Sequence, residues 1–224
     1  TGTLDGIEQT AGGKTLATVS FRGFRIAIPI REMLVLEDRM PSGRAYADYM
    51  NRLNRILGTM LGAEIDFIVK GIDSTTHSAV ASRREAMLRK RQTFYLGKDV
   101  SGNPYIYPGR LVEARVIAVA EKVLRVEAFG IECAIFARDL SWQWVSDVRD
   151  LYSVGDRVLV RVQEISGEDA EHLSIRADIR STFSETSVDN LKKCQVQSKY
   201  AGKVTDLRGG VVYIRLNNGV NAIA

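Results

Sequence analysis

One pattern of short strand-like runs and glycines occurs twice in this chain and a third time in part, and it limits the possible folds more than any other feature. The clearest copy covers residues 109–177, where runs rich in β-branched residues (116–119, 123–126 and 158–162) alternate with glycine and acidic residues. Strand-length runs between turn signals are typical of a small closed sheet, and not of helices or strand–helix–strand units. Residues 109–177 are therefore expected to form one small β-barrel.

The same pattern lies upstream at an offset of 107 residues, which pairs Gly2 with Gly109. Beyond an insertion the offset changes to 93, which pairs Gly62 with Gly155. A third, partial copy begins near residue 202, so we expect the chain to end inside a domain. Repeats at this spacing predict an array of similar modules.

The repeat predicts five segments. They are a degenerate barrel over 1–96 with a helical insert at 34–61, a linker over 97–108, a barrel over 109–182, a second linker over 183–193, and the start of a third, truncated barrel over 194–224.

Two helices are expected between the strands. The first, over about 43–61, places Tyr49, Leu53 and Ile56 on one stripe and Arg52 and Arg55 on the other side. We expect this stripe to be buried against the first barrel.

The second helix, over 83–95, carries basic residues at 83, 84, 89, 90 and 91. Such a run is either a solvated helix face or a site for a polyanion, and the sequence leaves both open.

Composition excludes several classes of protein. Hydrophobic residues make up 45% of the chain and charged residues 26%, as in ordinary globular proteins, and no apolar run approaches the roughly 20 residues of a membrane span. Cys133 and Cys194 lie in different repeats without metal-site spacing, which argues against zinc or disulfides and suits a cytoplasmic location. Because catalytic signatures are also missing, we expect no catalytic residues, no metal and no cofactor.

Several short motifs then point to a family. The step Val154-Gly155-Asp156-x-Val158 and the ending Leu173-Ser174-x-Arg176 are the most specific of them. In these residues the chain resembles the RNA-binding domain of the bacterial ribosomal protein S1 family. The resemblance implies an all-β fold of tandem five-stranded OB-fold (S1-type) barrels that bind single-stranded RNA on the face of strands two and three. The helical insert expected in the first barrel lies outside the resemblance.

The chain departs from the family at its binding positions. The family's aromatic residue on the third strand falls at Ala134 and Ala27, and its histidine two residues later is Phe136 here and Pro29 in the first repeat. The family's arginine before Leu-Ser falls at Ala170. The barrel pattern is therefore better preserved than the binding pattern.

Strand alternation separates the two faces of each sheet. It predicts that Ile131, Cys133 and Ile135 face the core and that Phe136 faces outward, where it either stacks a base or packs under the loop at 142–144. In the third repeat, Tyr213 and Arg215 form a candidate pair for stacking and phosphate binding. The complete set of candidate RNA-binding residues is Arg22, Arg25, Arg31, Arg125, Phe136, Arg138, Arg176, Tyr213 and Arg215.

The function expected from these observations is non-enzymatic binding of single-stranded RNA across tandem barrels, with the ribosome or messenger RNA as partners and no membrane association. We expect the insert helix to make no contact with RNA. Two alternatives stay open at this point. One is a protein-interaction scaffold with degenerate RNA faces and a protein partner, and the other is an accessory module of a larger ribonuclease.

Overall fold

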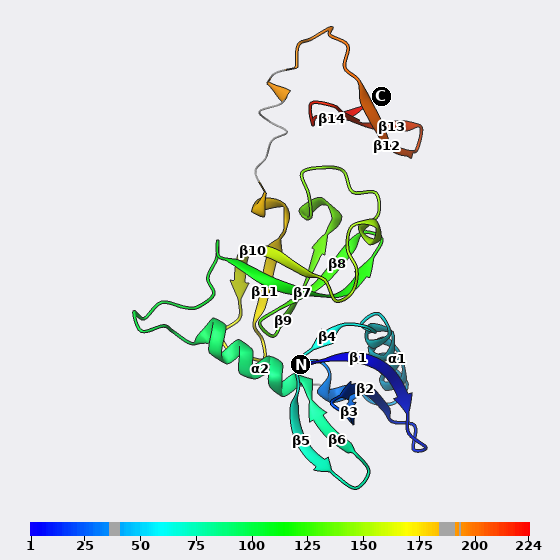
Figure 1. The fold of residues 1–224 in the computed structure, drawn as a ribbon, viewed down its shortest axis with the longest axis vertical. Helices are drawn as coiled ribbons and strands as arrows, with labels where there is room; N and C mark the ends of the chain where they lie inside the picture. Colours follow the sequence, from blue (N-terminus) through cyan, green and yellow to red (C-terminus); the bar gives the residue numbers. More distant parts are fainter. Residues whose placement is uncertain (36–40, 184–190, 193) are drawn as a thin grey trace.

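The computed structural model describes residues 1–35, 41–183, 191–192 and 194–224, and its strands form three separate sheets (Figure 1). The expected all-β class, with OB-type barrels and a helical insert in the first repeat, is confirmed. Most of the linker expected over 183–193, and residues 36–40 of the insert, lie outside the described residues.

Two short consecutive strands close the first sheet, because each of them pairs with a different edge of it. Its strands are β1 (Gly2–Gln9), β2 (Thr15–Phe21), β3 (Phe24–Pro29), β4 (Glu64–Ile65), β5 (Ile68–Asp73) and β6 (Ser78–Ser82), in the order β4-β1-β2-β3-β6-β5. Because β4 and β5 follow each other in sequence but pair with opposite edges, they join β1 to β6. The β3–β6 pair is parallel, whereas the other pairs are antiparallel.

The second sheet repeats this arrangement with five strands. They are β7 (Leu111–Ala120), β8 (Val123–Ala128), β9 (Ile131–Phe136), β10 (Arg157–Ser166) and β11 (Ser174–Asp178), in the order β11-β10-β7-β8-β9. The edge strands β9 and β11 contact each other, which nearly closes the barrel around its own apolar core. The third sheet contains β12 (Gly202–Arg208), β13 (Val211–Leu216) and β14 (Asn221–Ile223).

The helical segments lie between these strands. They are α1 (Arg44–Gly58), α2 (Arg83–Arg91), the π-helical turn η2 (Gln92–Leu96), and the 3₁₀ turns η1 (Ile30–Glu32), η3 (Ala137–Asp139), η4 (Val148–Asp150) and η5 (Arg180–Thr182). Both helices expected from the sequence are thus present, within a few residues of the expected bounds.

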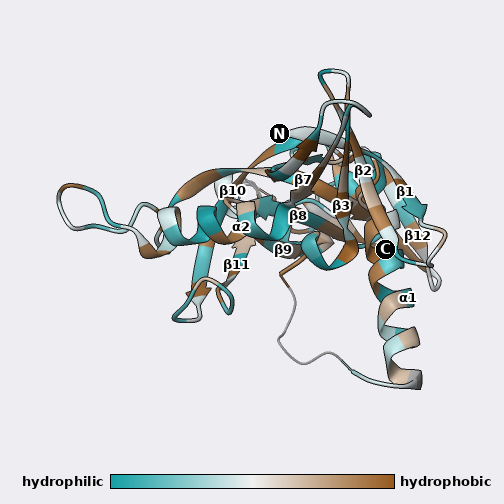
Figure 2. Cartoon of the chain, turned by 90° about the horizontal axis from the view of Figure 1, so that it is seen from below, coloured by the Kyte–Doolittle hydropathy of each residue, from teal (hydrophilic) through white to brown (hydrophobic). Residues whose placement is uncertain are grey.

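The insert helix α1 packs on the first barrel with its C-terminal half. Leu53, Leu57 and Met60 are buried in the first core, so the prediction is confirmed for Leu53. It is wrong in degree for Tyr49 and Ile56, which are only half-buried. Figure 2 shows α1 extending away from the sheets, and residues 45–48 in its N-terminal half are exposed.

Helix α2 lies between the two barrels, and its basic residues are not all on a solvated face. Ser82 caps its N-terminus by accepting a hydrogen bond from the backbone N–H of Glu85 at 3.0 Å. Arg83 and Arg91 are buried, and Arg91 donates to the carbonyl of Gly130 on the second barrel at 2.7 Å. For Arg83 and Arg91, both alternatives drawn from the sequence are therefore wrong, because these two arginines hold the barrels together.

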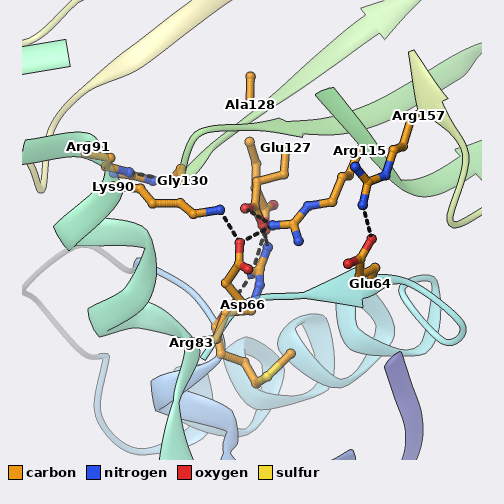
Figure 3. A network of polar contacts seen from close by, with 12 residues as sticks. Glu64, Asp66, Arg83, Lys90, Arg91, Arg115, Glu127, Ala128, Gly130 and Arg157 are labelled. Atoms are coloured by element: carbon orange, nitrogen blue, oxygen red, sulfur yellow. Dashed lines mark hydrogen bonds and ion pairs between the residues drawn. The ribbon is translucent and has the colours of Figure 1, made fainter. Parts of the chain in front are cut away.

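Arg83 is the centre of this interface (Figure 3). Its side chain is fully buried and donates to the carbonyl of Met33 at 2.7 Å and to Glu132 at 2.8 Å, and it is also ion-paired with Glu127. Burial alone would lower the pKa of Arg83, but the charges of Glu127 and Glu132 outweigh that effect, and the pKa lies above its usual value. The guanidinium is therefore charged in the folded protein.

A second set of ion pairs connects Asp66, which directly follows β4, to Lys90 of α2 and to Arg115 of β7. Asp66 accepts hydrogen bonds from Lys90 and Arg115, and Arg115 also bonds Glu127 at 2.8 Å. Burial would raise the pKa of Asp66, but the bonds from Lys90 and Arg115 hold it below its usual value. Ile117 of β7 is also buried in the first core. Apolar packing and ion pairs together therefore set the orientation of the first barrel relative to the second.

Candidate nucleic-acid interface

The candidate interface is the outward face of β8 and β9. The inward residues of both strands are buried, as strand alternation predicts; they are Leu124, Val126, Ala128, Ile131, Cys133 and Ile135. The outward residues face one another across the strands as three pairs, Val123 with Phe136, Arg125 with Ala134, and Glu127 with Glu132.

The first barrel and its α2 helix occupy one half of this face. Glu127 is buried and forms ion pairs with Arg83 and Arg115. Glu132 forms ion pairs with Arg83 and Arg125. Burial would raise the pKa of Glu132, but the two arginines hold it below its usual value. Only the half that carries Val123, Ala134 and Phe136 remains open.

Phe136 is the exposed aromatic residue of the open half. Its side chain is 49% exposed, so it faces outward as expected and does not pack under the loop at 142–144. Arg138 lies over the ring, with its guanidinium 5.7 Å from the ring centroid, and it pairs with Asp139 at 3.6 Å. An exposed ring beside a cation can stack a base and bind the adjacent phosphate.

Arg125 lies on β8 and Arg176 on β11, the two strands that neighbour β9. Arg125 is half-buried and ion-paired with Glu132, so part of its charge is already neutralised. Arg176, on β11, is exposed and pairs with Glu164 at 3.2 Å. Ion pairs between exposed residues are weak, so Arg176 can exchange its partner for a phosphate at low cost.

The three candidates of the first repeat lie on the first barrel, not on the face that carries Phe136. Arg22 occupies the β2–β3 turn, with its guanidinium 5.2 Å from the ring centroid of Phe21. Arg25, on β3, is ion-paired with Glu8, and Arg31, in η1, bonds the hydroxyl of Tyr46 at 3.3 Å. The outward positions Ala27 and Pro29 of β3 carry no aromatic ring.

Tyr213 of the third sheet is already stacked. Trp144 lies parallel to it, with ring centroids 4.8 Å apart and 8° between the planes, and the indole N–H donates to Asp206 at 3.1 Å. One face of the Tyr213 ring is therefore covered by protein, and the neighbouring Arg215 is half-buried. Sequence reasoning missed this contact because Trp144 and Tyr213 belong to different repeats.

A groove next to the open face was also missed. It lies between α1 and the β7–β8 hairpin and has a volume of about 470 Å³. It is lined by Arg52, Arg55, Ile56, Thr59, Ala118, Val119, Ala120, Val123 and Arg125. The sequence places Arg52 and Arg55 away from the first core but gives no signal that the second barrel stands opposite them.

Within the described ranges, no group of histidine, cysteine and acidic side chains could hold a metal ion. Among the same residues, no helix has the length and apolar character needed to span a bilayer.

The second barrel matches a known domain family, and nearly the whole chain aligns with a known protein. Residues 106–176 match the protein-family model of the S1 RNA binding domain. The chain is 21% identical to the small ribosomal subunit protein bS1 of Coxiella burnetii over 222 residues, which is 97% of this chain but only about a third (35%) of that protein. A solved a/eIF2alpha-aDim2p-rRNA complex from Pyrococcus horikoshii OT3 contains a chain with 20% identity and a TM-score of 0.32, over 40% of this chain and 53% of that one.

The family match covers the barrel that presents Phe136 and Arg138, and the relative aligns with nearly the whole chain. The resemblance expected from the sequence is therefore confirmed: the chain is S1-like, and its second barrel is similar to the S1 RNA-binding domain.

Proposed function

We propose that this chain binds single-stranded RNA without catalysing a reaction, and that the open half of the β8–β9 face is its principal contact. The observation that carries the proposal is the exposed ring of Phe136 beside the guanidinium of Arg138, on an S1 RNA-binding domain. A base stacked on one aromatic ring contributes about 1–3 kcal/mol whatever its identity. Binding should therefore tolerate changes in RNA sequence.

Phosphate contacts supply the rest of the affinity. Arg138, in the turn η3 that follows β9, and Arg176, on β11, are exposed, and Arg22 and Arg25 offer further cations on the first barrel. We propose that the three repeats are linked modules with the boundaries expected from the sequence, so that each raises the effective concentration of the next for one RNA strand. A cytoplasmic location, and the ribosome or messenger RNA as the natural partner, belong to the same proposal.

The test is a salt titration of RNA binding by fluorescence anisotropy. The probe is a labelled oligouridylate of about 16 nucleotides, the upper site size of one OB fold. About three to five phosphate contacts should give a slope of about −2 to −3.5 in log K against log salt, since each contact on a single strand contributes about −0.7. The absence of binding at low salt would refute the proposal and favour the protein-interaction alternative.

Two variants separate stacking from charge. Phe136→Ala should weaken binding by about 5- to 150-fold, the equivalent of one stacked base, and should leave the salt slope unchanged. Arg138→Ala should reduce the slope by about 0.7. The matched control is Tyr107→Ala, because Tyr107 is similarly exposed (48%) but lies before β7, outside the β8–β9 face. Equal losses for Phe136→Ala and Tyr107→Ala would show that this face is not the site.

A further inference from the structure

The groove between α1 and the β7–β8 hairpin has an apolar floor and a cationic rim. Ile56, Val119 and Val123 are among the floor residues, and the charged residues that line it are three arginines, Arg52, Arg55 and Arg125. Its lining contains no acidic residue. The first barrel contributes one wall and the second barrel the other, so neither barrel forms this groove alone.

Arg52 and Arg55 differ from the buried arginines of this protein. Both are exposed, and within the part of the chain that the structure describes neither side chain forms an ion pair or hydrogen bond. At positions i and i+3 of a helix they are neighbours on one face, where like charges repel. A cation in the last helical turn stabilises the helix dipole, which accounts for Arg55 but not for Arg52. A bound polyanion would neutralise both.

The groove is continuous with the proposed RNA face. Val123 lines the groove and is the cross-strand partner of Phe136, while Arg125 lines it and faces Ala134. A single-stranded RNA whose base stacks on Phe136 can therefore continue over Val123 into the groove. There its bases would meet the apolar floor and its phosphates would meet the arginines.

The walls of the groove are held in place before any ligand binds. Arg83, which directly follows β6 and is fully buried, is ion-paired with Glu127 and Glu132 of the β8–β9 hairpin, and Asp66 is ion-paired with both Lys90 and Arg115. A binding site that is already ordered saves the entropy that a flexible site loses on binding.

From these observations we infer that the insert helix forms the second wall of the RNA site. Arg52 and Arg55 bind phosphates of single-stranded RNA that leaves the Phe136 face and enters the groove. This inference rests on the proposed function and reverses the expectation that the helix makes no contact with RNA.

The test compares charge-matched double variants in the anisotropy titration. Each phosphate contact raises the binding constant about 5-fold at 0.1 M salt relative to 1 M, because it adds about 0.7 to the slope of log K against log salt. Arg52→Ala/Arg55→Ala should therefore weaken binding about 25-fold at 0.1 M and reduce the slope by about 1.4. Arg52→Lys/Arg55→Lys should retain most of the slope, because the charges remain.

The control is Lys14→Ala/Lys98→Ala, which removes two exposed charges from turns outside the groove. It should bind nearly as the wild type does. Because Arg52 and Arg55 are exposed, their removal should leave the melting temperature within about 2 °C of the wild type, from surface effects of up to about 0.5 kcal/mol.

The outcomes separate this inference from the function on which it rests. If the wild type fails to bind RNA, the proposed function falls. Suppose that Phe136→Ala weakens binding while Arg52→Ala/Arg55→Ala binds RNA as well as the control Lys14→Ala/Lys98→Ala. Then only the groove inference is overturned. Competition with polyglutamate of equal charge decides between ligands, because displacement as effective as that by unlabelled oligouridylate would assign the groove to an acidic protein and overturn the inference.

Discussion

Substitution of Arg83 by alanine should destabilise the protein more than any surface change, because Arg83 is the buried link between the two barrels. The substitution removes the donor to the Met33 carbonyl and one partner from each of Glu127 and Glu132. Glu127 keeps Arg115 and Glu132 keeps Arg125, but Glu127 remains buried with less compensating charge. Breaking a buried ion pair from one side costs about 3–5 kcal/mol.

For a chain of this size, 1 kcal/mol lowers the melting temperature by about 2–4 °C, so Arg83→Ala should lower it by about 6–20 °C. Scanning calorimetry measures this. We expect the two barrels to unfold together in the wild type and to separate into two transitions in Arg83→Ala. Arg176→Ala is the control, because its exposed pair with Glu164 is expected to contribute at most about 1 kcal/mol. Equal melting temperatures for Arg83→Ala and Arg176→Ala would refute the view that this network couples the barrels.

Three further predictions follow from burial and charge. Leu53→Ala should cost about 2–5 kcal/mol in urea denaturation, because Leu53 is 3% exposed in the first core; an unchanged midpoint would mean that α1 is not packed there. The pKa values of Asp66 and Glu132 lie below their usual values, so their contribution to stability is fully present above about pH 4.5 and is lost as the pH falls through the folded pKa values. A urea midpoint that stays constant from pH 7 to pH 3 would contradict this. Burial raises the pKa of the Cys133 thiol to about 12, so a thiol reagent should modify Cys194 but not Cys133 until the protein unfolds.

Features within a single repeat were predictable from the sequence. The offset between the copies anticipated the barrels, and helix α1 (Arg44–Gly58) lies within the range of about 43–61 expected for it. Alternation placed Cys133 in the core and Phe136 outside, because the side-chain period of a strand depends only on local backbone geometry.

Features between repeats were not predictable in the same way. From the sequence, the basic run that includes Arg83 predicts a surface helix. In the structure Arg83 is buried, because it is ion-paired with Glu127 and Glu132 of the second barrel. From the sequence, Tyr213 is predicted to be free for stacking. In the structure the ring of Trp144 stacks on it. In each case the partner comes from a segment far away in sequence, and only the packing of one barrel on another brings the two together.

The measurement that tests the central claim most directly is a titration of the isotope-labelled chain with unlabelled oligouridylate, followed by amide chemical shifts. The account predicts that the largest shifts fall at Val123 to Arg125 and Ala134 to Arg138, with a second set along α1 at Arg52 to Ile56. Shifts confined to the third sheet around Tyr213, or no shifts at an RNA concentration well above that of the protein, would contradict the claim that the open half of the β8–β9 face binds RNA.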